Sequence, residues 1–239
     1  MLTKLIWNGR SVAARTLYTY GRTQAQGTET FEMTTAQPTK KQKFSSFNLP
    51  KAFKQLGLTQ LQNWQIEARP VAPSAFFEER LSRLRRVFDL RSYEESKKLL
   101  IDAVCEEAIL KLEQLKIWKG AALESDTLIG NVDYLIAENK AYLEEPMVCI
   151  IEAKKDNFEQ GLAQCLVEMQ ACQWQNHQIG KNIDVLGIVT NGDVWQFYKL
   201  TTLGQVYETL PYAIQDVSAI LGVLHYTFKL CEQNLGVSQ

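Results

Sequence analysis

Histidine is scarce in this chain, and neither of its two histidines has a second ligand at the spacing of a zinc site. The five cysteines include no CxxC pair and lie within apolar runs, so we expect reduced, buried core residues. No apolar run reaches the roughly 18–20 residues of a membrane helix, and the apolar start of the chain is too short for a secretory signal. These absences make a cytoplasmic protein without zinc, disulfides or a membrane span the expectation.

A strong charge of one sign is also lacking, because 26 basic and 27 acidic residues give a formal net charge of −1. Such a balance offers no global attraction for a polyanion, so nucleic-acid binding would need a local basic face and a metal site. One dense group of basic residues comprises Arg80, Arg83, Arg85, Arg86, Arg91, Lys97 and Lys98. Acidic residues are interleaved with them, which leaves open both a solvated helix face and a face that contacts phosphate.

The first 45 residues differ in composition from the rest. Residues 21–43 are rich in Thr, Gln, Gly and Lys and show no hydrophobic period. Such a stretch buries too little apolar surface to offset its ordering entropy, so we predict a disordered tail over 1–45. Three interpretations of this segment stay open: a plain tail, the product of a start codon placed before an internal Met33, or a basic arm ending at Lys43. Residues 46–239 are predicted to form one domain, with 46–90 as a helical extension at its N-terminal side.

Hydrophobic spacing within that domain alternates between the periods of helices and strands. Helices are predicted over 75–90, where Ser74 is the N-cap, and over 93–115, 158–178 and 213–231. Strands are predicted over 147–154, 184–190, 194–200 and 206–210, with a pair of strands within 123–138. Asn191-Gly192 is a hairpin signal between two of these strands. The order predicts an α/β fold in which helices flank a mixed central sheet.

Two carboxylates and a lysine are expected to meet at one edge of this sheet. Asp133 is expected inside a strand over 131–136, and the apolar strand that begins at Met147 ends in Ile151-Glu152-Ala153-Lys154. Glu152 and Lys154 are two residues apart, so both side chains leave the same face of their strand. Oxygen ligands suit Mg²⁺ or Mn²⁺, so Asp133, Glu152 and the Ala153 carbonyl are candidate ligands.

A bare D…ExK pattern is also what a simple ion pair at a sheet end would show. Three features favour a site. The charges follow a wholly apolar stretch, 148–151, and burying ionised groups is costly unless they have a partner or a function. Asp133 is expected on a strand of its own. A polar stripe of Gln160, Gln164 and Glu168 follows at helical spacing on the next helix.

The stretches GNVDYLI, PMVCIIEAKKDNFEQGLAQCLVEMQA and VLGIVTNGDVWQFYKL together resemble the PD-(D/E)xK nuclease superfamily. The similarity extends over about 47–221 and is closest to small cyanobacterial proteins related to the nuclease domain of type I restriction subunits. It implies a restriction-endonuclease-like core. The proline that usually precedes the aspartate is absent, because Asn131-Val132 occupies that place.

The resemblance also implies roles for individual residues. Asp133 and Glu152 would be metal ligands, and Lys154 the catalytic lysine. Gln164 would face the site from the helix behind the active strand. The acid of the first long helix would be Glu94, with Lys97 nearby and with Glu106 and Glu107 as rivals.

The expected function is hydrolysis of DNA phosphodiesters by an endonuclease that depends on Mg²⁺ or Mn²⁺. Two alternatives stay open: a module on the same fold that binds nucleic acid or protein without catalysis, and a nuclease subunit that needs a partner chain. A homodimer is compatible with each of these readings.

Overall fold

The computed structural model describes residues 18–19, 34–35, 40–154 and 156–236 of the 239-residue chain. The chain divides into two units, Met1–Lys40 and Lys41–Gln239. Within the first unit, β1 (Tyr18–Thr19) pairs antiparallel with β2 (Thr34–Thr35). The rest of the predicted tail up to residue 39 lies outside the described residues.

The second unit begins at Lys41, earlier than the predicted domain start at residue 46. β3 (Gln42–Lys43) pairs with β7 (Leu128–Asn131), and the short 3-10 helix η1 (Phe44–Ser46) follows it. The Phe44 ring is 2% exposed and packs against Gly130, where an added Cβ would lie 2.6 Å from the ring. One aromatic side chain at the end of a polar stretch therefore moves the domain boundary.

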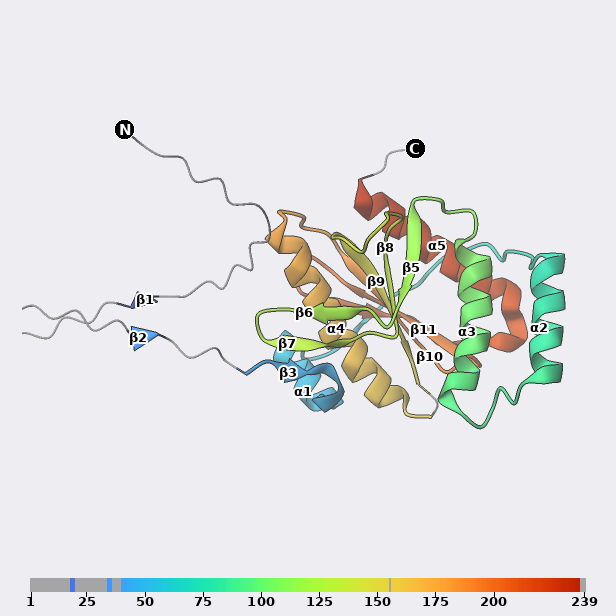
Figure 1. Ribbon diagram of the computed structural model, residues 1–239, viewed down its shortest axis with the longest axis horizontal. Helices are drawn as coiled ribbons and strands as arrows, with labels where there is room; N and C mark the ends of the chain where they lie inside the picture. The colour runs from blue at the N-terminus through green and yellow to red at the C-terminus, as the bar shows by residue number, and fades with distance from the viewer. Residues whose placement is uncertain (1–17, 20–33, 36–39, 155, 237–239) are drawn as a thin grey trace, which may run out of the picture. The chain divides into compact units, whose positions relative to one another are not determined.

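A mixed sheet of eight strands forms the centre of this unit (Figure 1). Its main path runs in the order β4 (Gln62–Asn63), β12 (Val206–Glu208), β11 (Val194–Leu200), β10 (Val185–Thr190), β9 (Met147–Ala153), β8 (Tyr134–Glu138) and β5 (Leu115–Lys119). β13 (Tyr212–Ala213) pairs with β11. β9 and β10 are parallel, whereas β8 and β11 run antiparallel to them. β3, β7 and β6 (Ala122–Glu124) form a smaller sheet.

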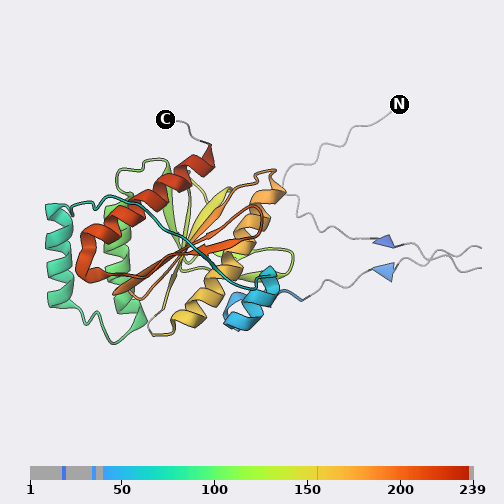
Figure 2. The same cartoon turned by 180° about the vertical axis from the view of Figure 1, so that it is seen from behind.

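Helices cover both faces of the central sheet (Figures 1 and 2). α4 (Phe158–Gln178) packs on β9 and β10 from one face and carries α1 (Leu49–Leu56) against its outer side. α3 (Glu94–Ile109) and α5 (Val217–Leu235) cover the other face, and α2 (Ala75–Val87) packs on α3. Each layer has its own apolar core. The predicted α/β class, a mixed sheet flanked by helices, is confirmed.

Several boundaries differ from the predicted ones. The helix over 158–178 is confirmed, but the second helix ends at Ile109 rather than at 115. The apolar spacing suggested a longer helix because Leu112 and Leu115, which follow the end of the helix, are also buried. The prediction of one strand over 131–136 was also wrong, because the chain leaves strand conformation between the end of β7 and the start of β8. α1, β4 and β5 were not predicted.

All five cysteines are buried and free, as predicted. Within the described part of the chain, no helix combines the length and apolarity that a bilayer span requires.

Candidate functional site

The end of β9 brings the two charged residues of the ExK motif onto the sheet face that α4 covers. Glu152 is paired in register with Val189 of β10. Gly161, in the first turn of α4, lets the helix approach closely, because a Cβ there would lie 2.8 Å from Val189 Cγ1 and 2.9 Å from Lys154 Cγ. The stem of Lys154 therefore lies between the strand end and the first turn of α4.

Glu152 is an almost fully buried carboxylate, 2% exposed, and its Oε1 lies 2.7 Å from Lys154 Nζ. The pKa of Glu152 is raised to about 7, first by burial and then by the charge of Asp133, while the Lys154 ammonium acts in the opposite direction. Burial lowers the pKa of Lys154, but the charge and hydrogen bond of Glu152, together with the charges of Asp133 and Glu94, outweigh it, so that pKa ends above its ordinary value.

Asp133 lies in the break between β7 and β8 rather than within a strand. Its Oδ2 accepts a hydrogen bond of 2.9 Å from the backbone N–H of Ala153, the residue between Glu152 and Lys154. Its Oδ1 lies 3.0 Å from the Nζ of Lys98 on α3. The break frees Asp133 from strand pairing, and the Ala153 bond then holds its carboxylate beside the ExK motif.

α3 contributes Glu94 and Lys98 from the other side of the sheet end. The charge of Glu94 acts on both Glu152 and Lys154, and Lys98 Nζ is 3.7 Å from Glu94 Oε1. Lys97, expected nearby, points elsewhere: it is buried and its Nζ lies 3.4 Å from Asp193. Successive residues of an α-helix are rotated by about 100° around its axis, so the side chains of Lys97 and Lys98 point in different directions.

Glu106 and Glu107, the rivals of Glu94, have other contacts. Glu106 forms an ion pair with Arg80 of α2. Glu107 accepts hydrogen bonds from the backbone N–H of Ser74 at 2.7 Å and from its hydroxyl at 2.9 Å. Both acids fasten the start and outer side of α2 to α3, so Glu94 is the first-helix acid that acts electrostatically on the site.

The polar stripe of α4 divides into three different environments. Gln160 donates a hydrogen bond of 2.7 Å to the Phe47 carbonyl, which is a packing contact. Gln164 is half-buried, and its side chain makes no hydrogen bond to any residue of the described part. Glu168 is fully buried, and both its carboxyl oxygens lack a hydrogen-bond partner within the described residues.

Glu168 is the acidic residue that the sequence predictions did not place in the site. Burial raises its pKa well above the ordinary value, and the charges of Glu152 and Asp133 raise it further. The Lys154 ammonium acts in the opposite direction. Its signal in the sequence was a charged residue in the helical stripe that faces the sheet. The charges of Glu152 and Asp133 thus act on the buried Glu168 carboxyl group.

The donor chemistry suits a hard divalent cation. Mg²⁺ keeps several waters and is bound through one or two carboxylates plus substrate phosphate, so Asp133 and Glu152 suffice in number. Among residues 40–154 and 156–236, no group of three or more His, Cys, Asp or Glu residues is arranged to hold a metal ion. The role of the Ala153 carbonyl as a further ligand stays a prediction.

No protein-family model and no curated protein sequence matches the chain.

Proposed function

We propose that this chain is a divalent-metal-dependent endonuclease that hydrolyses DNA phosphodiesters at a D…ExK site on a restriction-endonuclease-like core. The observation that supports the proposal is the 2.9 Å hydrogen bond from the Ala153 N–H to Asp133 Oδ2, which joins two motifs 20 residues apart in the chain. It brings an aspartate, a buried glutamate and a lysine to one strand end. Those are the residue types that metal-assisted phosphodiester hydrolysis requires.

Asp133 and Glu152 are the residues that hold Mg²⁺ or Mn²⁺ in this proposal. The bound ion supplies Lewis-acid polarisation of the phosphate and lowers the pKa of a coordinated water. Lys154 Nζ, 2.7 Å from Glu152, is placed to orient the attacking water or to stabilise charge that develops on the phosphoryl oxygens. Gln164 and Glu94 position these groups from α4 and α3.

A non-catalytic binding module is the second candidate function, because lysines already neutralise both carboxylates. Lys154 pairs with Glu152 at 2.7 Å, and Lys98 pairs with Asp133 at 3.0 Å. In this reading the lysines take the place of a cation, and the residues form a structural ion-pair network. The two functions differ in metal binding and in turnover.

A paired measurement on the full chain separates them: calorimetric titration with Mn²⁺, and nicking of supercoiled plasmid at saturating metal. Glu152→Ala is expected to abolish metal binding and nicking together, because it removes a ligand. Lys154→Ala is expected to keep the metal while nicking falls at least roughly 1,000-fold, as for loss of a group that acts in the transition state. Gln164→Ala is expected to keep partial activity.

Glu113→Ala is the matched control, since Glu113 is exposed and lies after α3 at the other end of the helix. It should bind Mn²⁺ and nick DNA as the wild type does. Metal binding without nicking on supercoiled, linear, single-stranded and branched DNA would favour the binding module. No Mn²⁺ binding by the wild type would overturn the metal site and leave a structural ion pair.

A further inference from the structure

A hollow opens at the corner where the chain turns from α2 into α3. Its volume is about 500 Å³, within the range of small-ligand sites, and we call it the α2–α3 hollow. Its lining includes Arg85, Phe88, Asp89, Arg91, Leu100 and Asp193. The first four come from the end of α2 and the connection to α3, and Asp193 comes from the turn between β10 and β11.

Two arginines and two aspartates line this hollow, and both aspartates already have partners within the protein. Asp89 Oδ1 accepts hydrogen bonds from the backbone N–H groups of Arg91 at 3.0 Å and Ser92 at 3.4 Å. Asp193 is paired with Lys97 at 3.4 Å. Arg85 and Arg91 are exposed, and within the described residues neither guanidinium is in a salt bridge, while the charge of Arg91 acts on the neighbouring Asp89 carboxylate. Exposed guanidinium groups that are not in a salt bridge are suited to phosphate.

An exposed aromatic ring lies at the same place. Phe88, the residue directly after α2, is 47% exposed, and Tyr93, just before α3, is 70% exposed. Arginines beside exposed aromatic rings are the combination that binds single-stranded nucleic acid, because unpaired bases stack on the rings while the cations follow the backbone. Bases inside a duplex are stacked on one another and cannot reach such a ring.

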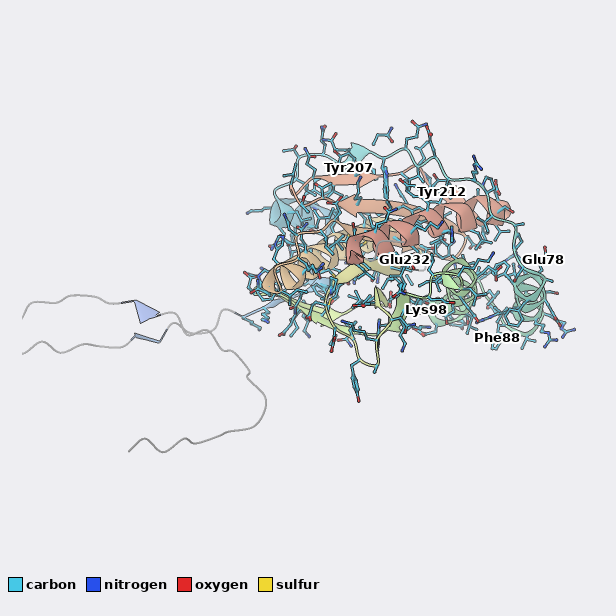
Figure 3. All side chains as sticks on the ribbon, turned by 90° about the horizontal axis from the view of Figure 1, so that it is seen from above. Glu78, Phe88, Lys98, Tyr207, Tyr212 and Glu232 are labelled. Carbon is cyan, nitrogen blue, oxygen red and sulfur yellow. The ribbon has the colours of Figure 1, made fainter. Side chains whose placement is uncertain are left out.

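α3 links the hollow to the candidate site through two consecutive lysines. Lys97 Nζ lies 3.4 Å from Asp193, which lines the hollow, and Lys98 Nζ lies 3.0 Å from Asp133 in the site. The first turns of α3 therefore lie between the hollow and the candidate site. An α-helix is roughly 10–12 Å across with its side chains. Phe88 and Lys98 are labelled on these neighbouring elements in Figure 3.

We propose that the α2–α3 hollow holds an unpaired nucleotide of a DNA strand whose neighbouring phosphodiester lies at Asp133, Glu152 and Lys154. Phe88 stacks on the base, and Arg85 and Arg91 bind the flanking phosphates. The inference rests on the proposed function and narrows its substrate class to DNA with a single-stranded segment.

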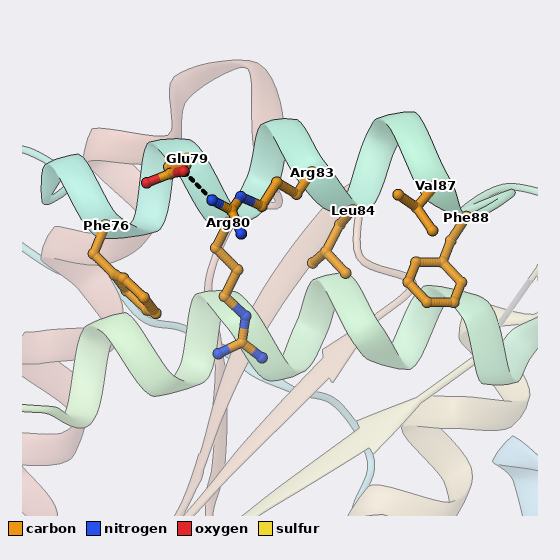
Figure 4. Close-up of a pocket in the computed structure, with 7 residues that line it drawn as sticks. All are labelled: Phe76, Glu79, Arg80, Arg83, Leu84, Val87 and Phe88. Carbon is orange, nitrogen blue, oxygen red and sulfur yellow. Dashed lines mark hydrogen bonds and ion pairs between the residues drawn. The ribbon is translucent and has the colours of Figure 1, made fainter.

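A second hollow, lined by residues of α2 and by Phe88 at its end, supplies matched controls (Figure 4). Its volume is about 270 Å³, and its lining includes Phe76, Arg80 and Arg83, together with Phe88, which therefore borders both hollows. Its arginines are already paired, Arg80 with Glu106 and Arg83 with Glu79. Phe76 is 65% exposed, so it matches Phe88 as an exposed ring without free arginines around it.

The test measures binding of a fluorescein-labelled oligothymidine of about 12 nucleotides, and of a duplex of equal length, by anisotropy of the full chain in EDTA. The wild type is expected to bind the single strand more tightly than the duplex. Phe88→Leu, which keeps an apolar side chain, should weaken single-strand binding roughly 5- to 100-fold through lost stacking. Phe76→Ala should match the wild type, as should Tyr142→Ala, which removes an exposed ring from the connection between β8 and β9.

The double variant Arg85→Ala/Arg91→Ala tests the phosphate contacts. Its plot of log affinity against log salt should be shallower by about 1.4, since each phosphate contact on a single strand contributes about 0.7. Arg83→Ala is the matched control and should leave that slope unchanged. An unchanged slope in the double variant would contradict phosphate binding by Arg85 and Arg91.

The outcomes distinguish this inference from the proposed nuclease function. Equal binding of single strand and duplex, or a loss in Phe76→Ala as large as in Phe88→Leu, overturns the hollow as a nucleotide site. If plasmid nicking by the wild type persists in that case, the nuclease proposal stands without it. Single-strand binding that Phe88→Leu removes, in a wild type without cleavage under any divalent metal, supports the hollow and counts against the nuclease.

Discussion

Two polar side chains of α4, about two turns apart, are both fully buried and have opposite surroundings. The Asn176 amide oxygen accepts a hydrogen bond of 2.8 Å from the Met147 N–H, and its amide nitrogen donates one of 2.7 Å to the Met147 carbonyl. Glu168 has no hydrogen-bond partner within the described residues at either carboxyl oxygen. Asn176 completes the backbone of β9, whereas Glu168 faces the charges of Glu152 and Asp133.

The comparison distinguishes a structural polar residue from one that belongs to a site. A buried polar group costs free energy unless it is hydrogen-bonded, so a folded protein satisfies the groups that serve only its architecture. Asn176 follows that rule at the start of β9. Glu168 departs from that rule, and the charges that act on its carboxyl group include those of Glu152 and Lys154 at the end of β9. On the same helix, the Asn176 side chain is therefore hydrogen-bonded to the start of β9, whereas the Glu168 carboxyl group has no hydrogen-bond partner within the described residues.

The largest expected effect on stability comes from Asn176→Ala. It leaves two buried backbone groups of Met147 without partners, so the free energy of unfolding should fall by about 2–4 kcal/mol. For a domain of this size that is a loss of about 4–16 °C in Tm. Thermal denaturation measures it. Asn139→Ala, an exposed asparagine that bonds the Glu113 carbonyl, is the control and should change stability by less than about 0.5 kcal/mol.

The next effect is a pH dependence carried by Glu152. Its pKa is about 7 in the folded chain and about 4.5 when unfolded, so the folded state binds the proton more tightly. The stability that this proton contributes is complete below pH 4.5 and is lost as pH rises through 7. Without metal, the Glu152→Gln variant should therefore gain on the wild type between these pH values by on the order of 2 kcal/mol. Denaturant titrations across this range measure the gain. A difference that does not vary with pH would contradict the raised pKa.

The smallest effect, and the one of opposite sign to Asn176→Ala, is expected from Glu168→Leu. Replacing an unpartnered buried carboxyl by an apolar side chain of similar size should raise the free energy of unfolding by about 1 kcal/mol. Glu159→Leu, at an exposed position of the same helix, is the control and should be close to neutral. Destabilisation as large as that of Asn176→Ala would show that Glu168 has a structural partner, and the comparison would fail.

Short-range sequence patterns predicted the part of the site that lies on one strand and its following helix. Glu152 and Lys154 were expected on one face because side chains alternate along a strand, and both lie on the α4 side. The helix over 158–178 was confirmed because its apolar and polar residues keep one period throughout. Such predictions depend only on neighbours in the chain.

Contacts between distant elements could not be predicted in the same way. The choice of Lys98 rather than Lys97 depends on the rotation of α3 about its axis, which packing against the sheet decides. The roles of Glu106 and Glu107 depend on how α2 docks on α3. The domain start depends on Phe44 reaching Gly130.

The sequence by itself determined the α/β class, the buried strand that ends in Glu152 and Lys154, and the helix behind it, because local periodicity reports which face of an element is apolar. Only the tertiary structure decided that Asp133 leaves its strand to accept the Ala153 N–H, that Lys98 reaches Asp133, and that Glu168 is buried without a partner. The physical reason is that hydrogen bonds and charge interactions between distant segments depend on distances of a few ångströms. Those distances exist only once the two layers of helices have closed on the sheet.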